Sequence, residues 1–560
     1  MALLRRRESV RPLSIPPRAA TGPGTSRLRP RGVTQRSPCQ KHCIAGNDVR
    51  GVIALIAQHE RLGLSLEAAF DQAFYRFVET SPFPATMGRI CPHRCEENCS
   101  RNAQDGGVSV GAIERFVGDW AIARGLPLPG PEASRQEAGP IAVVGAGPAG
   151  LTCAYHLVRR GYRVTVHDSS PRPGGLLRHA VPPYRLPRPV LDAEITRLLA
   201  LGVELRSRST IGKDVTLDDL RRTHAAVFVA VGAPNSRPAT VPGADGPGVY
   251  LGARFLREAV RGQTPAVGRE IVVVGGGATA IDAARVAVRL TRGGAHVRLV
   301  RQENERVSSE LEEAIAEGVE VELLTTVAEV LRGPDGAVRA VRTQRVTLGS
   351  QTPSGFPELL PVPDSDRELA ADTVVFALGQ EPDWARLGLD PSAPFAPEPG
   401  GDPSRCLLWS GGDANRPGLA AEAIAQGRQA AAAIDAALRQ VPLPEPVAVR
   451  DVAPERLKPA CFEGKPRLVP RLTSIATRLA DPWSEVALDH DAAAIVAEAS
   501  RCYSCGDCSG CERCWMYCTP GCMKRSPDGR PGHYFEINLD LCDGCKKCAE
   551  ECPCGFLEMI

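Results

Sequence analysis

Two runs of cysteine near the C-terminus have the spacing of iron–sulfur ligands. Each run reads Cys-x2-Cys-x2-Cys-x3-Cys. In a ferredoxin with two clusters, the fourth cysteine of each run binds the cluster of the other run. The spacing therefore predicts two [4Fe–4S] sites, one held by Cys508, Cys511, Cys514 and Cys552, and the other by Cys518, Cys542, Cys545 and Cys548. Paired zinc ribbons would require neither two matched runs nor this spacing.

Further cysteines lie at both ends of the chain. Five occur in a stretch with helical periodicity, where long inserts between C-x3-C pairs fit structural zinc poorly and predict iron–sulfur ligation: Cys39, Cys43, Cys91, Cys95 and Cys99. Cys502 and Cys505 are surplus to the ferredoxin count. We favour a redox-active dithiol for this pair. The alternatives are ligands in a shifted register, or completion of an N-terminal site with Cys39 and Cys99. Cys522 and Cys554 are unassigned.

A nucleotide-binding fingerprint lies between the two groups of cysteines in the sequence. The apolar strand at 141–144 runs into Gly145, Gly147 and Gly150. These glycines allow a tight turn, a close approach to a pyrophosphate and close packing of the following helix. The N–H groups of the first helical turn then face the phosphates. A second strand ends at Asp168, whose carboxylate can accept hydrogen bonds from a ribose.

A second fingerprint begins at residue 271 with a strand that leads to Gly275, Gly277 and Ala280, and its second strand ends at Arg301. Two dinucleotide folds in one chain favour two cofactors that exchange electrons over a duplicated domain with one inactive site.

Two more strands are expected to end beside the first nucleotide-binding fingerprint. An apolar strand ends at Gly232, and Gly412 and Asp413 precede a long alanine-rich helix. Asp413 could bond a cofactor hydroxyl while the start of that helix faces phosphate.

Length and composition bound the remaining possibilities. The 560 residues suffice for three or four domains. A net charge of +2 gives no reason to expect nucleic acid or an anionic membrane as partner, and no apolar run approaches a membrane span. The N-terminus lacks the apolar core of a signal peptide. Seventeen of the 20 cysteines lie in two terminal groups, which indicates metal centres in a reducing, cytoplasmic compartment.

The predicted fold class is α/β, with two nested Rossmann-like domains between a helical iron–sulfur domain and a ferredoxin domain. The expected segments are a disordered basic tail (1–37), the helical domain (38–130), the first dinucleotide domain (140–260 and 370–440), the second (261–369), a linker (441–495) and the two-cluster ferredoxin domain (496–560).

Residues 38 to about 440 resemble the glutamate synthase small subunit family. The matching motifs are PCQKHCIAGN, GRICPHRCEENC, GAGPAGL, PGGLL with YRLP, GGGATAIDAAR, ALGQEP and GGDANRPGLAAEAIAQGR. The resemblance implies FAD at the first fingerprint, with Gly175 and Leu176 of PGGLL beside it, and NAD(P)H at the second. It also implies that Glu114 ligates a cluster together with Cys43, Cys91 and Cys95.

Two departures from the family pattern matter. Relatives carry a CxxC upstream of the segment at Cys39, which this sequence lacks, so Cys39 and Cys99 supply only two ligands and we expect at least one N-terminal cluster. NADP-using members place Tyr-Arg-Arg after the second fingerprint's second strand, where this chain has Arg301, Gln302 and Glu303. A carboxylate disfavours a 2′-phosphate, which predicts a preference for NAD(H) over NADP(H).

The resemblance implies an oxidoreductase that passes electrons between NAD(P)H, FAD, clusters and a redox protein partner. Domain order and the CxxC resemble the iron–sulfur flavoproteins associated with dissimilatory sulfite reductase in sulfur oxidisers, in which NAD⁺ would be the acceptor. Alternatives are a glutamate synthase small subunit, an NAD(P)H:ferredoxin oxidoreductase, and a non-catalytic redox sensor or scaffold. A homodimer is one option for assembly. No catalytic proton donor is assigned, because hydride transfer requires none.

Overall fold

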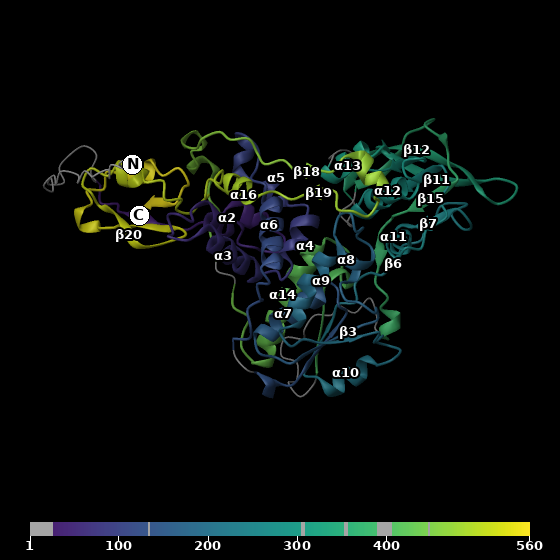
Figure 1. Ribbon diagram of the computed structural model, residues 1–560, viewed down its shortest axis with the longest axis horizontal. Helices are drawn as coiled ribbons and strands as arrows, with labels where there is room; N and C mark the ends of the chain where they lie inside the picture. Colours follow the sequence, from purple (N-terminus) through teal and green to yellow (C-terminus); the bar gives the residue numbers. More distant parts are fainter. Residues whose placement is uncertain (1–25, 133–134, 304–307, 352–356, 389–405, 446–447) are drawn as a thin grey trace, which may run out of the picture.

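The structure is a computed structural model that describes residues 26–132, 135–303, 308–351, 357–388, 406–445 and 448–560. The domains follow one another along the long axis (Figure 1). The ferredoxin domain, with the C-terminus and the first described residues, lies at one end, the helical domain lies in the middle, and the second dinucleotide domain lies at the other end. The first dinucleotide domain is below the helical domain in this view.

The helical domain is held together by faces of aromatic residues. In α3, Phe70, Phe74 and Phe77 recur at helical spacing and are at most 1 % exposed, so they form one face against the core. Gly118 of α6 lets that helix approach α4, since a Cβ there would lie 2.2 Å from the Ala85 nitrogen. The helices are α1 (Pro38–His42), α2 (Val49–Ala57), α3 (Leu66–Val78), α4 (Pro84–Ile90), α5 (Arg94–Glu97) and α6 (Val110–Ala123).

The first dinucleotide domain is a five-stranded parallel sheet in the order β17-β5-β2-β3-β4. Its central strand is buried at every position, as expected for a parallel sheet covered on both faces. The strands are β2 (Ile141–Val144), β3 (Val164–Asp168), β4 (Glu204–Ser207), β5 (Ala226–Val229) and β17 (Leu407–Ser410). The helices are α7 (Pro148–Arg159), α8 (Gly175–His179), α9 (Arg188–Leu199), α10 (Leu217–Thr223) and α14 (Ala420–Leu438).

The second dinucleotide domain repeats this plan in the order β10-β9-β8-β15-β7, again all parallel. Its elements are β7 (Val249–Leu251), α11 (Gly252–Val260), β8 (Glu270–Val274), α12 (Ala278–Leu290), β9 (His296–Val300), α13 (Ser309–Ala316), β10 (Val319–Glu322) and β15 (Thr373–Phe376). An antiparallel sheet is inserted before β15: β11 (Thr325–Arg332), β12 (Val338–Gln351), β13 (Pro357–Pro361) and β14 (Arg367–Ala370).

The predicted boundaries of this second domain, 261–369, are too narrow. Strands β7 and β15 both belong to its sheet, and β15 lies between β8 and β7. The chain crosses between the two domains where β6 (Asn235–Ser236) pairs with β16 (Gln380–Glu381). An apolar strand that is buried on both faces has the same pattern in either sheet, so its sequence does not say which sheet it joins.

The segment predicted as an irregular linker, 441–495, instead forms a strap across three domains (residues 448–491). It contains a short ribbon of β18 (Arg471–Leu472) and β19 (Ala487–Leu488) and the helix α15 (Ile475–Ala480). Arg478 bonds Glu317 of the second dinucleotide domain at 2.9 Å, and Glu485 bonds Arg89 of the helical domain at 2.7 Å. Long-range ion pairs therefore join this segment to both of these domains.

The ferredoxin domain includes the first strand of the chain. Its elements are α17 (Arg513–Met516), β20 (Met523–Arg530), β21 (His533–Ile537), α18 (Lys547–Glu550) and β22 (Leu557–Met559). Strand β1 (Pro30–Gly32) pairs antiparallel with β22, and Gln35 bonds Glu558 at 2.8 Å. The prediction of a disordered tail is therefore wrong for residues 26–37, because their partner is the far end of the chain. Residues 1–25 lie outside the described residues.

Candidate functional site

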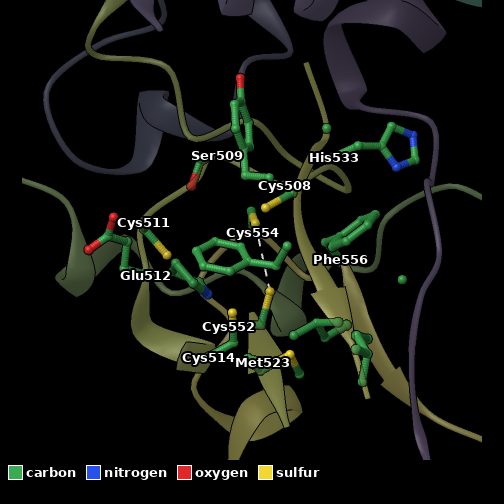
Figure 2. A pocket seen from close by; sticks show the side chains of 17 residues that line it. Cys508, Ser509, Cys511, Glu512, Cys514, Met523, His533, Cys552, Cys554 and Phe556 are labelled. Atoms are coloured by element: carbon green, nitrogen blue, oxygen red, sulfur yellow. Dashed lines mark hydrogen bonds between the residues drawn. The ribbon is translucent and has the colours of Figure 1, made fainter. Parts of the chain in front are cut away.

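One cavity of about 230 Å³ collects the first ferredoxin set. Cys508, Cys511, Cys514 and Cys552 all line it, as the crossover of the fourth cysteine predicts (Figure 2). Cys554 also lines it, with its Sγ 3.7 Å from the Cys552 Sγ. The Cys554 thiol and nearby backbone N–H groups lower the pKa of Cys552, which favours the thiolate that a metal requires.

A second cavity collects the other ferredoxin set, which is Cys518, Cys542, Cys545 and Cys548. Cys522 lines it as well. Met523 lines both cavities, so the two sites share a wall. Each cavity thus has one thiol more than the spacing rule counts, and only the proximity of Cys554 and Cys522 to a run in the sequence could have indicated this.

The cysteines of the helical domain fall into two groups. In the first, Cys43 and Cys91 lie near Glu114, which is 4 % exposed on α6, and Cys95 lies near these two cysteines. Asn47 donates to Glu114 Oε1 at 3.2 Å, and His93 Nε2 lies 3.5 Å from Glu114 Oε2. Burial, together with the nearby Glu114 carboxylate and Cys43, raises the pKa of Cys91 to about 12.

The second group brings distant parts of the sequence together. Cys39 and Cys99 line a cavity with Cys502 and Cys505, and Cys95 lines the same cavity from the first group. Burial raises the pKa of both Cys502 and Cys505 to about 12. A reactive dithiol needs an accessible thiol with a lowered pKa, so this environment disfavours the dithiol interpretation. In the part of the chain that the structure describes, none of the 20 cysteines forms a disulfide.

Backbone N–H groups surround several of the cysteine sulfurs. Within the described ranges, no group of three or more His, Cys, Asp or Glu side chains is arranged to hold a metal ion. Several cysteine sulfurs accept backbone N–H bonds, a contact that tunes iron–sulfur sites: Cys43 from Asn47 at 3.2 Å, Cys91 from His93 at 3.5 Å, Cys502 from Ser504 at 3.3 Å, Cys508 from Gly510 at 3.4 Å and Cys518 from Cys522 at 3.2 Å.

The first fingerprint has the shape that a pyrophosphate needs. Gly145 adopts φ +111°, and a Cβ there would lie 2.3 Å from the Ala230 oxygen. A Cβ on Gly175 would lie 2.8 Å from the Gly147 Cα, so the PGGLL turn, with Leu176 in α8, closes on the fingerprint. At Gly150, a Cβ would lie 1.9 Å from the Gly145 oxygen. Glycine is therefore required at each contact.

The predicted carboxylates lie at the edge of the same sheet. Asp168 accepts from the Ala146 and Ser170 nitrogens at 2.7 Å each, so its carboxylate also fixes the fingerprint loop. Asp413 is in the turn before α14 and accepts from the Gly418 nitrogen at 3.2 Å. Burial raises the pKa of Asp413 to about 6. Neighbouring Gly412 adopts φ +68°, and Gly232 adopts φ +69° just beyond β5.

The second fingerprint has the same framework and a charged side chain over it. Gly275 adopts φ +145° with Ala280 packed below it, while the space at Gly277 is open. Arg301 donates to the Gly276 oxygen at 3.0 Å, and its Nε lies 3.3 Å from Glu303. A Cβ on Gly276 would lie 1.8 Å from the Glu303 carboxylate. Glu303 therefore lies at the turn where the dinucleotide should bind.

Two residues that the sequence did not single out connect the fingerprints. Arg185, in the loop after PGGLL, donates to both oxygens of Asp282 at 3.0 and 2.8 Å and also bonds Glu310. Asp282 belongs to α12 of the second fingerprint. Their presence in the motifs YRLP and GGGATAIDAAR was the available signal. These charged hydrogen bonds, from Arg185 Nη1 to Asp282 and from Nη2 to Glu310, join the second domain to the first.

Comparisons with known families agree with this arrangement. Residues 139–427, more than half of the chain, match the pyridine nucleotide-disulphide oxidoreductase model. Residues 33–126 match dihydropyrimidine dehydrogenase domain II, 4Fe-4S cluster, and residues 535–558 match the 4Fe-4S binding domain. The match from residue 33 agrees with an ordered segment before Cys39. Within the described residues, no helix is both long and apolar enough to cross a membrane.

Curated relatives are similar over much of the chain. The beta subunit of NADP(+)-dependent formate dehydrogenase from Moorella thermoacetica is 33% identical over 84% of this chain and 70% of its own length. The Escherichia coli glutamate synthase [NADPH] small chain is 33% identical over 66% of this chain and 84% of its length. The beta subunit of NADPH-Fe(3+) oxidoreductase from Geobacter sulfurreducens is 35% identical over 63% of this chain, which spans 53% of that relative. The chain therefore belongs to the pyridine nucleotide-disulphide oxidoreductase family and is a glutamate synthase small subunit-like FAD/NAD(P) oxidoreductase with 4Fe–4S domains.

Proposed function

We propose that this enzyme passes electrons between NAD(H), FAD, [4Fe–4S] clusters and a redox protein partner. The observation that carries the proposal is a contact between the dinucleotide and cysteine sites. Arg428 of α14, the helix that starts beside the first fingerprint, donates to the Ala45 oxygen at 3.3 Å. Ala45 lies in the loop that follows Cys43. The nucleotide and cluster sites are thus parts of one packed unit rather than separate modules.

The residues around the first fingerprint fit FAD. Gly145, Gly147 and Gly150 leave room for a pyrophosphate at the start of α7, and Gly175 closes the turn over it. Asp168 and Asp413 each keep acceptor capacity for cofactor hydroxyls. When bound, FAD exchanges a hydride with nicotinamide and single electrons with iron–sulfur clusters. The protein holds and orients these groups, and no side chain is assigned as a proton donor.

The second fingerprint is proposed to bind NAD(H) in preference to NADP(H). Gly275, Gly277, Ala280 and Arg301 would hold the dinucleotide, and Glu303 supports the preference because its carboxylate at Gly276 would repel a 2′-phosphate. The names of the relatives from Moorella and Escherichia coli specify NADP(+) and NADPH, so this preference would distinguish the chain from them.

The proposed cluster ligands follow the cysteine groups. The first helical-domain cluster would be held by Cys43, Cys91, Cys95 and Glu114. The two ferredoxin clusters would be held by the crossover sets that line the cavities in that domain, Cys508, Cys511, Cys514 and Cys552, and Cys518, Cys542, Cys545 and Cys548.

The finer proposal concerns the partner. A sulfite reductase-type enzyme, with electrons running inward to NAD⁺ in the cytoplasm, is supported by the ferredoxin domain and the CxxC before it. The glutamate synthase small chain is the second candidate, supported by a relative of that name. Cross-linking and isolation of the complex from the native cell, with the subunits identified by mass spectrometry, decides between the two and also reports any homodimer.

Anaerobic addition of NADH to protein with one FAD per chain tests the proposed electron transfer. We expect the flavin absorption band to bleach, and a redox dye to be reduced with NADH as donor. A flavin band that persists under excess NADH and NADPH would overturn the proposal. Absence of dye reduction in cofactor-replete protein would favour a sensor or scaffold.

A further inference from the structure

We propose that Cys39, Cys99, Cys502 and Cys505 hold a further [4Fe–4S] cluster, with the two ligands that the helical domain lacks supplied from beyond the strap. The four cysteines line one cavity, which two N-terminal segments and one C-terminal segment enclose. Cys505 also lies against the segment of Cys99, since its Sγ is 3.5 Å from the Ser100 Oγ. Four cysteines around one cavity are the donor set of a [4Fe–4S] cluster.

The loop at Cys502 has the backbone of a cluster-binding loop. Ser504, the third residue of Cys502-x-x-Cys505, adopts φ +52°. Gly510 and Gly544, at the same position in the first CxxC of each ferredoxin run, adopt +68° and +74°. Ser504 donates its N–H to the Cys502 sulfur at 3.3 Å, as Gly510 does to Cys508 at 3.4 Å. A serine tolerates this conformation poorly, so the turn is imposed by its surroundings rather than by local preference.

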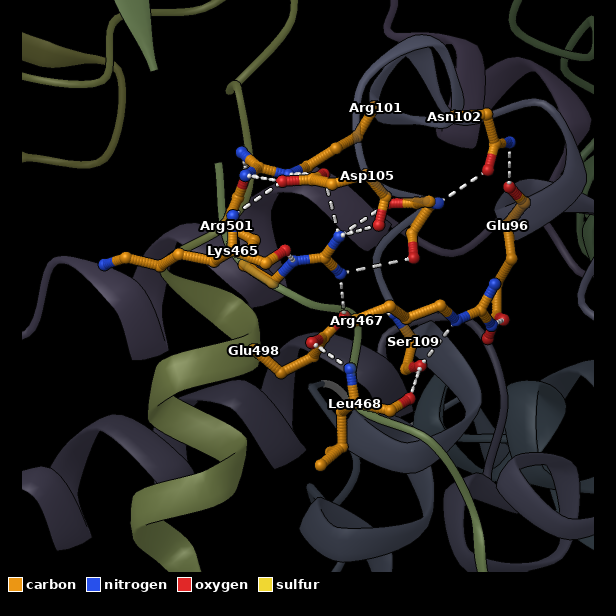
Figure 3. Close-up of polar contacts among 12 residues, drawn as sticks. Glu96, Arg101, Asn102, Asp105, Ser109, Lys465, Arg467, Leu468, Glu498 and Arg501 are labelled. Atoms are coloured by element: carbon orange, nitrogen blue, oxygen red, sulfur yellow. Dashed lines mark hydrogen bonds and ion pairs between the residues drawn. The ribbon is translucent and has the colours of Figure 1, made fainter. Parts of the chain in front are cut away.

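A buried ionic network fixes this loop to the helical domain (Figure 3). Arg501 donates to Asp105 at 3.0 Å, to the Gly106 oxygen at 2.7 Å and to Glu498 at 2.7 Å. Arg101 in turn donates to the Arg501 oxygen at 2.5 Å. The Cys502 loop therefore docks beside Cys99 in the helical domain.

A cationic side chain is built into the wall of the cavity. Arg50 of α2 is buried and donates to the Cys505 oxygen at 2.7 Å and the Gln35 oxygen at 2.6 Å. It thus ties the Cys502–Cys505 loop to the segment before Cys39. A cluster with four thiolate ligands carries net negative charge, which a guanidinium in the wall offsets. If Cys502 and Cys505 were neutral thiols, the positive charge of Arg50 would be balanced by its ion pair with Asp507, at 3.6 Å.

The site also fills a gap in the series of cysteine cavities. Cys95 of the Glu114 group lines the same cavity, and Cys505 precedes Cys508 of the first ferredoxin set by three residues. The proposed cluster lies between the helical-domain group and the ferredoxin groups. This inference rests on the proposed function only in that the chain carries iron–sulfur clusters.

Iron and acid-labile sulfide in anaerobically purified, full-length protein test the proposal. Four clusters correspond to about 16 iron atoms per chain. We expect about 12 in Cys502→Ser/Cys505→Ser and about 12 in Cys39→Ser/Cys99→Ser. The fourfold variant should also retain about 12, because all four residues hold the same cluster. Cys406→Ser, in the first dinucleotide domain, is the matched control and should retain about 16.

Alkylation of the wild-type protein gives a second measurement that does not depend on variants that fold. The four cysteines should be protected from iodoacetamide together and become reactive together when a chelator removes iron. Wild-type iron near 12 with Cys502 and Cys505 alkylated or in a disulfide, or a fourfold variant near 8, would overturn the inference. Full iron with no bleaching by NADH would instead contradict only the proposed electron transfer.

Discussion

Glu303 is the residue at which nicotinamide selectivity should be decided. Its carboxylate lies at Gly276 and pairs with Arg301 at 3.3 Å. Two unit charges about 4 Å apart in water interact by about 1 kcal/mol, which is about fivefold in kcat/KM. We therefore expect Glu303→Gln to raise kcat/KM for NADPH about fivefold relative to NADH. Glu312→Gln, exposed on α13, is the control. A wild-type protein that already favours NADPH would contradict the prediction.

Glu114 offers a test of the unusual ligand in the helical domain. The side chain is buried, and its two oxygens are within reach of Asn47 and His93. We expect Glu114→Ala to lower iron by about four atoms per chain. Glu114→Gln keeps an oxygen in the same place and should retain the iron, with a shifted reduction potential as the signature. Full iron in Glu114→Ala would exclude the ligand role.

Among single residues, the sequence predicted those that a regular spacing identifies, such as the cysteines of the ferredoxin runs. The crossover of Cys552 and Cys518 was predicted from spacing, and each of them lines the cavity of the other run. The grouping of Cys502 with Cys39 and Cys99 was one of three alternatives that the sequence left open, because Cys502 lies more than 400 residues from the other two. Local spacing carries no information about a site that folding assembles from both ends of a chain.

Among the elements, the strap is joined to another domain by an ion pair that no periodic pattern in its own sequence indicates. Arg478 of α15 bonds Glu317, which Arg285 and Arg289 also hold. Burial opposes the ionisation of Glu317, but the hydrogen bonds from Arg289 and Arg285 outweigh it and lower its pKa to about 2. The prolines and short apolar runs of this segment give no periodic pattern, so its sequence predicted a linker. Its contacts are with residues of another domain, which local sequence does not show.

The strap should open locally when this contact is removed. A hydrogen bond to a charged group contributes about 2 kcal/mol, or about thirtyfold in an opening equilibrium. We expect Arg478→Met to increase amide exchange in residues 473–486 by about that factor, with the cofactor content unchanged. Arg471→Met changes an exposed arginine of the same strap and should have little effect. Equal exchange in the two variants would show that packing, and not the ion pair, orders the strap.

The ion pair of Arg478 with Glu317 makes the strap sensitive to acid, because protonation of Glu317 removes the charge that Arg478 pairs with. The pKa of Glu317 is lower in the folded protein than its usual value near 4.5, so its contribution to stability is present above that pH and is lost as the pH falls toward about 2. Exchange in residues 473–486 should therefore rise over this range in the wild type. In Glu317→Gln, exchange should be raised already at neutral pH and should depend less on acid. An identical acid profile in both proteins would assign the acid response to other groups.

At the scale of the whole molecule, the pairing of β1 with β22 joins the segment before Cys39 to the ferredoxin domain. Strand β1 pairs with β22, and the chain then continues directly into α1 with Cys39, so one short segment connects the ferredoxin domain to the helical domain. The Val33 nitrogen bonds the Phe556 oxygen at 2.9 Å, and Arg36 pairs with Asp451 at 2.7 Å. This segment and the Cys502 loop both reach the cavity of the proposed cluster, so the placement of the ferredoxin domain and the assembly of that cavity depend on each other.

Gly32 tests this closure, because it lies against the Phe556 ring. A Cβ there would lie 2.5 Å from the ring, and overpacking a filled site costs about 1–3 kcal/mol. We expect Gly32→Val to raise amide exchange in residues 29–33 and 556–560 about tenfold or more, since each 1.4 kcal/mol is tenfold. Gly130→Val, at a position with open space around it, is the control. If the pairing of β1 with β22 holds the ferredoxin domain in place, iodoacetamide should also react faster with Cys39 and Cys505 in Gly32→Val. Unchanged exchange and unchanged alkylation would mean that the Cys502 loop alone fixes the two domains.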